Sequence, residues 1–331
     1  MKAASAMSRV PPASSDPRLV VFDVGARFGI HPSWQPISRS PLLDTHAFEP
    51  DLQEAERLAA KYSGQPNYHV TPLAFGDSNG PKSLHLLAHR GQSSFLRPNL
   101  EGAWFGVTRQ EEGRIESTRE CQMRRLDDWC LETGLYPDFL KTDTEGYDYE
   151  VLKGGERVVR ERVLGLRCEV LFQQTFVGTG EFDQIFRFMR DRDFVLANLD
   201  YDGKGSAQSY FCPTPKFGLL TGCEAVFVRE PRFYRALSST RFLKALIFLF
   251  LNGAADVAVP CMLERRELLG DGAADAPLRA LTERLFLLGA KRLQTQPGSN
   301  FDRAKADYEQ VFGRAFPDMH RFYESELLNP A

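Results

Sequence analysis

Short apolar runs alternate with amphipathic stretches from Leu19 to about Glu230, and this alternation constrains the fold more than any other feature. It is the pattern of a parallel sheet with helices on both faces. Stretches 50–62 and 181–193 each repeat apolar residues on one helical face. The candidate strands, each a short apolar run, are 19–23, 45–49, 68–75, 138–142, 163–170, 194–199 and 224–229. The sequence therefore predicts an α/β domain over residues 18–231, with a parallel sheet at its centre.

Residues 78–125 interrupt the alternation. Segments "KSLHLLAHR" and "GRIESTRECQMRRL" alternate at period two, which predicts extra strands on either side of the loop 91–106. A long insertion of this kind is commonly a lid or a substrate loop, and a poorly ordered loop is the alternative. Ser93 and Ser94 in this loop are candidates to bind cofactor or substrate, although a hydrogen bond within the loop explains them equally well.

The two ends of the chain differ from this pattern. Residues 1–17 are small, polar and proline-bearing, without the apolar centre of a signal peptide, and predict a disordered lead-in. Residues 232–331 read as a helical C-terminal extension. Polar residues interrupt its apolar run at 242–259, which falls short of the ~20 residues of a membrane span. A buried helix or a subunit contact is expected there, so the helices could form a homo-oligomer surface.

Charge and cysteine content exclude few functions. The formal net charge of −3 gives no electrostatic reason to expect nucleic acid as a partner. The six cysteines are scattered without a CxxC motif, which favours reduced thiols in a cytoplasmic protein over a disulfide framework or a zinc site.

The turn in "LVVFDVGARFG" (19–29) follows the first strand, at the sheet edge where open α/β folds bind ligands. A dinucleotide fingerprint needs a glycine at position 27, where this chain has Arg27, and no Walker A sequence occurs. The spacing of Asp23, Gly25 and Gly29 better suits a ligand with an amino-acid head and no phosphate, such as S-adenosylmethionine. A tight glycine turn without a ligand is the alternative.

Two further strand ends carry acids. Glu49 lies 24 residues after Gly25, where a strand-tip carboxylate can accept both hydroxyls of a ribose. Lys141, Asp143 and Glu145 alternate along "DFLKTDTEG". Paired acids at a strand tip can orient a cationic cofactor, take a proton or share a divalent metal. For each of these acids, capping of the following helix is the alternative.

In this order, the segments "FDVGARFG", "HAFEP", "LAFGDSNG", "GQSSF", "RRLDDWC" and "DFLKTDTEGYDYEVLKGG" resemble an FkbM-type methyltransferase over about residues 19–200. That family has the class I, Rossmann-like, S-adenosylmethionine-dependent fold and typically methylates hydroxyl oxygens of natural products and glycans. This chain departs from it at Arg27, where asparagine is common, and in the proline-rich stretch after Gly29.

The resemblance implies a site as well as a fold. It places Gly25 and Gly29 at the methionine end of the cofactor, Glu49 on the ribose and Asp77 near the adenine. Asp143 and Glu145 would face the reacting centre. The cofactor-contacting residues expected on this basis are Asp23, Gly25, Ala26, Arg27, Gly29, Glu49, Pro50, Asp77 and Asp143.

The expected function is O-methylation of a hydroxyl group on a small-molecule, glycan or lipid-linked acceptor. The candidate bases are Asp143, Glu145 and Glu169, although Glu169 could equally be a paired acid beside Arg167. A divalent metal is possible but not indicated by the sequence. One rival interpretation is a nicotinamide-dependent oxidoreductase, disfavoured by the missing glycine fingerprint. The other is a non-catalytic binding or assembly module that acts through residues 232–331.

Overall fold

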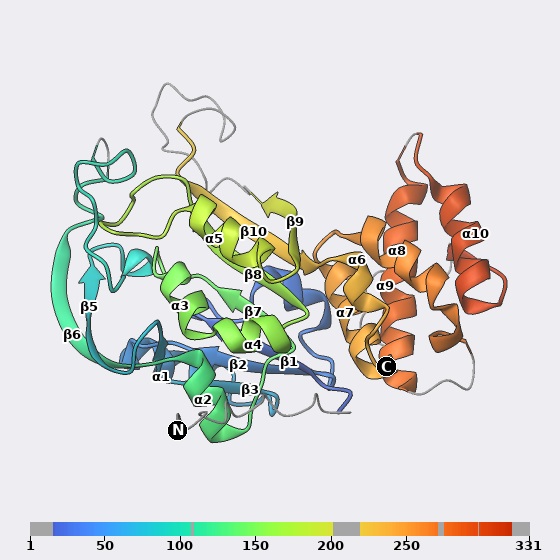
Figure 1. Cartoon of the computed structure of the whole chain (residues 1–331), viewed down its shortest axis with the longest axis horizontal. Helices are drawn as coiled ribbons and strands as arrows, with labels where there is room; N and C mark the ends of the chain where they lie inside the picture. Colours follow the sequence, from blue (N-terminus) through green and yellow to red (C-terminus); the bar gives the residue numbers. More distant parts are fainter. Residues whose placement is uncertain (1–15, 107–108, 201–218, 271–274, 297, 320–331) are drawn as a thin grey trace, which may run out of the picture.

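The computed structural model describes residues 16–106, 109–200, 219–270, 275–296 and 298–319. Most of the expected N-terminal lead-in therefore lies outside the described residues. A seven-stranded sheet runs in the order β3-β2-β1-β7-β8-β10-β9. Its strands are β1 (Leu19–Val24), β2 (Leu43–Phe48), β3 (Tyr68–Thr71), β7 (Phe139–Thr142), β8 (Gly165–Leu171), β9 (Phe194–Asp200) and β10 (Gly222–Arg229). The expected α/β architecture is confirmed (Figure 1).

Two details of the expected sheet are wrong. Strand β10 runs antiparallel to both β8 and β9. Parallel neighbours need a crossover connection, and the amino-acid sequence between β9 and β10 shows no amphipathic helical pattern that could supply one. The expected strand 68–75 is also two strands. Pro72 has no amide hydrogen for a ladder, and the amide of Leu73 turns back to Thr71 O at 2.9 Å. The strand after this turn, β4 (Ala74–Phe75), joins a different sheet.

The insertion forms that second sheet, in the order β4-β6-β5. Strands β5 (Gly80–Leu87) and β6 (Ile115–Arg124) pair antiparallel, which confirms the extra strands expected in 78–125. The loop between them contains the short helix η2 (Arg90–Gln92). Figure 1 shows β5 and β6 on the side of the molecule opposite to the C-terminal helices.

Helices cover both faces of the central sheet, with a separate hydrophobic core on each. One core contains residues of α2 (Leu126–Thr133), α3 (Asp148–Gly154), α4 (Glu156–Glu161) and α5 (Phe182–Arg190). The other contains residues of η1 (Pro32–Ile37), α1 (Leu52–Lys61) and the C-terminal helices. The helices at 52–61 and 182–190 confirm the two amphipathic patterns of the sequence. The prolines around Trp34 limit the segment after the glycine turn to the short η1.

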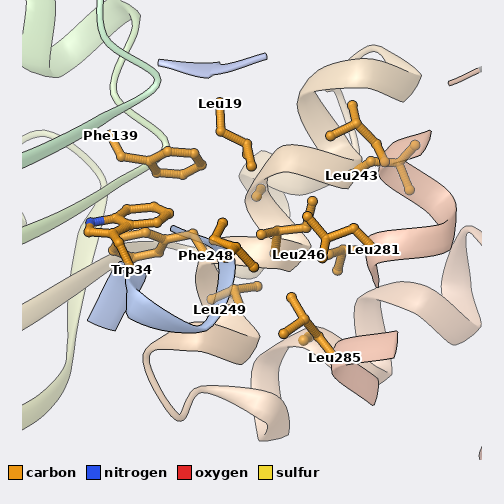
Figure 2. Close-up of a cluster of buried hydrophobic side chains, with 14 of the residues drawn as sticks. Leu19, Trp34, Phe139, Leu243, Leu246, Phe248, Leu249, Leu281 and Leu285 are labelled. Atoms are coloured by element: carbon orange, nitrogen blue, oxygen red, sulfur yellow. The ribbon is translucent and has the colours of Figure 1, made fainter. Parts of the chain in front are cut away.

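The C-terminal helices share the second core with the sheet. They are α6 (Pro231–Tyr234), α7 (Ser239–Leu251), α8 (Ala255–Glu264), η3 (Arg266–Leu268), α9 (Ala276–Gln294) and α10 (Phe301–Phe312). Figure 2 shows Phe248 of α7 beside Phe139 of β7 and Trp34; the two phenylalanine rings stack with centroids 4.9 Å apart. The buried helix expected in this region is confirmed, although it ends at Leu251 and α8 follows. The division at residue 231 stays a prediction. No helix within the described residues has the length and apolar character needed to cross a membrane.

Candidate functional site

A cavity opens where the strand order reverses, between the carboxyl ends of β1 and β7, which is the usual ligand position in an open α/β sheet. The space between its walls, open mouth included, is about 630 Å³. The lining comes from the tips of β1, β2 and β7 and from the second sheet with its loop. The residues are Val24, Gly25, Arg27, Phe28, Phe48, Glu49, Pro50, Leu73, Ala74, Phe75, Leu84, Gly91, Ser93, Phe95, Asp143, Thr144 and Glu145.

Gly25 brings the first turn into direct contact with the neighbouring strand tips. Its φ is +80°, and a Cβ at this position would lie 1.9 Å from the carbonyl oxygen of Asp143. The amides of Gly25 and Ala26 both donate to Phe48 O, at 3.0 and 3.2 Å. The glycine is therefore required by backbone conformation and by packing, and it leaves bare backbone at the cavity wall. Gly29 instead packs against Tyr62, whose hydroxyl would lie 2.3 Å from an added Cβ.

Lys141 is a buried cation beneath this turn. Its Nζ lies 3.1 Å from Asp23 Oδ1 and 3.6 Å from Asp143 Oδ2, and it donates to Gly25 O at 3.2 Å. Burial opposes the charge, but the two carboxylates outweigh it and raise the pKa of Lys141 above its usual range. Lys141 thus joins the first turn to the end of β7. The Asp23 carboxylate already faces an ammonium group, and its contact with a cofactor stays a prediction.

Arg27 occupies the position of the missing fingerprint glycine and neutralises the acids after β2. Its Nη2 lies 3.0 Å from Asp51 Oδ2 and 4.0 Å from Glu49 Oε1. Glu49 Oε1 accepts the Asp51 amide at 2.9 Å. Burial raises the pKa of Glu49 to about 7, although Arg27 acts in the opposite direction. An arginine here is thus accommodated as an ion-pair partner, and a buried carboxyl group remains at the tip of β2.

Three carboxylates converge at the other side of the cavity. Oxygens of Asp143, Glu145 and Glu169 lie within 4.8 Å of one another, with Glu169 contributed by β8. Burial and the nearby Glu145 and Asp143 raise the pKa of Glu169 well above its usual range. Such a group can share a proton among its members or bind a cation through oxygen ligands.

The backbone that presents this cluster is strained and fixed. Glu145 is a non-glycine residue at φ 54°, followed by Gly146 at φ 85°. Ser94 Oγ donates to Glu145 O and Thr179 Oγ1 donates to Gly146 O, both at 2.7 Å. Strained residues held by their surroundings are concentrated at functional sites. The loop 91–106 therefore supports the acids through Ser94, while Ser93 lines the cavity itself.

Some expected residues line the cavity and others do not. Those that line it are Gly25, Arg27, Glu49, Pro50, Asp143 and Glu145. Asp23, Ala26, Gly29, Asp77 and Glu169 are absent from the lining that the described residues form. The Asp77 carboxylate lies 3.5 Å from both Tyr147 Oη and Lys153 Nζ, so its proximity to an adenine stays a prediction.

Sequence reasoning missed two kinds of site residue. The first is the set of aromatic rings in the wall, Phe28, Phe48, Phe75 and Phe95. Phe28 is 71% exposed. The sequence could have indicated it as a site residue, because a phenylalanine inside a polar glycine turn is unusual. The second is Asp148 in the first turn of α3, which accepts the Thr144 amide at 3.2 Å. Burial and the charge of Asp143 raise the pKa of Asp148 to about 7.

A family model described as the methyltransferase FkbM domain matches residues 23–196, which include the glycine turn, the acidic strand tips and the cavity-lining insertion. The chain belongs to the FkbM methyltransferase family. This finding confirms the family resemblance seen in the sequence.

Three named proteins are similar to this FkbM-family chain at low sequence identity. The 2-O-methyltransferase NoeI of Sinorhizobium fredii is 26% identical over 146 residues, which are 43% of this chain and 60% of that protein. A crystallised methyltransferase FkbM from Methylobacillus flagellatus is 16% identical with a TM-score of 0.38, covering 63% of this chain and 44% of the other. The 23S rRNA methyltransferase ErmE is 10% identical with a TM-score of 0.25, covering 91% and 92%.

Proposed function

We propose that this FkbM-family methyltransferase uses S-adenosylmethionine to methylate a hydroxyl oxygen of a glycan or natural-product acceptor. The observation that carries the proposal is a single cavity that joins the bare backbone at Gly25 to the carboxylates of Asp143 and Glu145. Family membership supports the cofactor. The name of the 26%-identical relative, a 2-O-methyltransferase, supports oxygen as the accepting atom.

The residues present fit this cofactor. Gly25 presents bare backbone in the cavity wall, which an amino-acid head could approach, and Asp143 supplies a carboxylate for a cationic ligand in the same wall. Glu49 at the tip of β2 would hold the ribose hydroxyls, and Pro50 continues the same wall. Ion pairing with Asp51 compensates the charge of Arg27, so the cavity does not repel a cation. When bound, S-adenosylmethionine supplies a methyl group on a positively charged sulfur.

The three carboxylates of Asp143, Glu145 and Glu169, here the acid cluster, would act on the acceptor. A carboxylate oxygen of Asp143 or Glu145 would accept the proton of the acceptor hydroxyl, and the cluster would hold the acceptor in line. The raised pKa of Glu169 suits it to hold a proton between its neighbours and limit their repulsion. The three acids also form an oxygen-only ligand set of the kind that Mg²⁺ and Ca²⁺ prefer, so the test includes divalent ions.

The decisive experiment follows a labelled methyl group from S-adenosylmethionine into an extract of the source cells, with and without a chelator. Asp143→Asn and Glu145→Gln should each lower kcat by about 10²–10⁴-fold, the usual contribution of a positioned general base. Glu132→Gln, on the exposed face of α2, is the matched control and should keep full turnover. Cofactor affinity measured for every variant separates loss of binding from loss of chemistry.

Two outcomes would overturn the proposal. Wild-type turnover in both cluster variants would remove these acids from the mechanism. Thermal stabilisation by a nicotinamide dinucleotide, with none by S-adenosylmethionine, would favour the oxidoreductase interpretation.

A further inference from the structure

A second group of metal-ligating side chains lies on the sheet, away from the methyltransferase cavity. Asp44 and His46 are two residues apart on β2 and share one face of the sheet. His69 on β3 is the direct parallel partner of His46 in the ladder. The ligand atoms of these three residues all lie within 4.8 Å of one another. The register of two adjacent strands thus assembles two imidazoles and one carboxylate.

The geometry of this group is close to that of a metal site. Asp44 Oδ1 lies 3.0 Å from His69 Nε2 and 3.6 Å from His46 Nε2. Tetrahedral ligands at ~2.0–2.1 Å from a zinc ion are about 3.3 Å apart, which lies between the two observed distances. The two rings are stacked, with centroids 4.6 Å apart, so both present Nε2 toward the same carboxylate oxygen.

One nitrogen of the group is buried and unsatisfied. His46 Nε2 has no hydrogen-bond partner among the described residues, and its distance from Asp44 is too long for a hydrogen bond. Buried polar atoms are usually paired, and a bound ion is one of the accepted explanations for an exception. Asp44 Oδ1 lies within hydrogen-bond distance of His69 Nε2 but reaches His46 Nε2 only at the 3.6 Å of an ion pair.

The surroundings support a cation and give it access. The second Asp44 oxygen accepts from Arg18 Nη1 at 3.1 Å, which holds the first oxygen toward the histidines, as outer-shell partners of metal ligands do. Arg18 is itself paired with Asp16 at 2.6 Å, so its positive charge is compensated. The His69 side chain is 45% exposed, which leaves an entry path and room for water ligands.

We propose that Asp44, His46 and His69 bind a divalent transition-metal ion, and that Zn²⁺ is the ion their ligand types favour. The ion ties the edge strand β3 to β2 and, through Arg18, to the segment before β1. Asp44 lies five residues before Glu49, about 16 Å along the strand, so the site is separate from the cavity and does not depend on the proposed methyl transfer.

The test is zinc binding by the untagged, chelator-treated full chain, measured by equilibrium dialysis with metal analysis. One ion per chain is expected in the wild type. His69→Gln should bind zinc more than about 100-fold more weakly, because loss of an outer-shell partner alone costs about 10–100-fold. His89→Gln, an exposed histidine on another segment, is the matched control and should bind as the wild type does.

Two further measurements test whether the ion binds at Asp44, His46 and His69. Cobalt(II) in place of zinc should give the intense visible absorption of nitrogen-ligated, low-coordinate cobalt in the wild type and in Asp143→Asn, and not in His69→Gln. Zinc should raise Tm in the same two proteins. Absence of zinc binding by the wild type, unchanged affinity in His69→Gln, or loss of binding in Asp143→Asn would each overturn the proposal.

Discussion

Replacing Gly25 by alanine tests the strand-tip geometry most sharply. The added Cβ would lie 1.9 Å from Asp143 O, about 1.5 Å closer than the 3.4 Å at which ordinary contact begins. Asp143 has little freedom to yield, because its amide donates to Val24 O at 3.0 Å. Overpacking of this kind costs about 1–3 kcal/mol. The φ of +80° adds about 1–2 kcal/mol for a residue with a side chain. The expected loss in free energy of unfolding is therefore about 2–5 kcal/mol.

Gly134→Ala separates the two contributions. Gly134 also has a positive φ, +71°, but nothing lies within 4 Å of the position of its Cβ. Gly134→Ala should therefore lower the free energy of unfolding only by the cost of the positive φ, about 1–2 kcal/mol. Urea unfolding gives both values if the slope m stays constant, and calorimetry gives the affinity for S-adenosylmethionine. Gly25→Ala should also bind the cofactor at least tenfold more weakly. Equal stability and equal affinity in the two variants would refute the reasoning.

Three further predictions concern buried charge and packing. Glu49 has a native pKa of about 7 against 4.5 unfolded, so its protonated form stabilises the fold and this contribution is lost as pH rises from about 4.5 through 7. Glu49→Gln should therefore remove up to about 3 kcal/mol of the change in free energy of unfolding between pH 4.5 and 7, and it should weaken cofactor binding. An unchanged dependence of the unfolding free energy on pH contradicts the raised pKa of Glu49. Lys141→Met leaves Asp23 as an uncompensated buried charge and should cost about 3–5 kcal/mol in chemical denaturation, where a loss under 1 kcal/mol would exclude the ion pair. Phe248→Ala removes the ring stacked on Phe139 and should cost about 3–5 kcal/mol; near-normal stability would show that α7 does not need the sheet.

Local patterns predicted most strands of the central sheet and the edge of the sheet at which the cavity opens. The apolar run before Gly25 and the acid at Glu49 indicated two strand tips, and the α/β alternation indicated that parallel tips meet at one edge. Pro72 was an overlooked local signal, because a residue without an amide hydrogen ends the ladder of β3. The direction of β10 was another overlooked signal, because the sequence between β9 and β10 shows no amphipathic helical pattern for a crossover.

Contacts between distant segments could not be predicted in the same way. The pairing of Lys141 with Asp23 depends on strands more than one hundred residues apart. An apolar α7 had to be buried, but nothing in its pattern indicated that Phe139 would be its partner. The register of β2 and β3 places His46 beside His69, which lies 23 residues further along the chain. Each of these contacts is fixed by tertiary packing, which periodicity does not encode.

A crystal structure of the chain with S-adenosylhomocysteine would test the central claim most directly. We expect density for the whole ligand between the first turn and the end of β7, with its ribose on Glu49 and its sulfur toward Asp143 and Glu145. Density at another place, or an empty cavity in crystals grown at saturating ligand, would contradict the account.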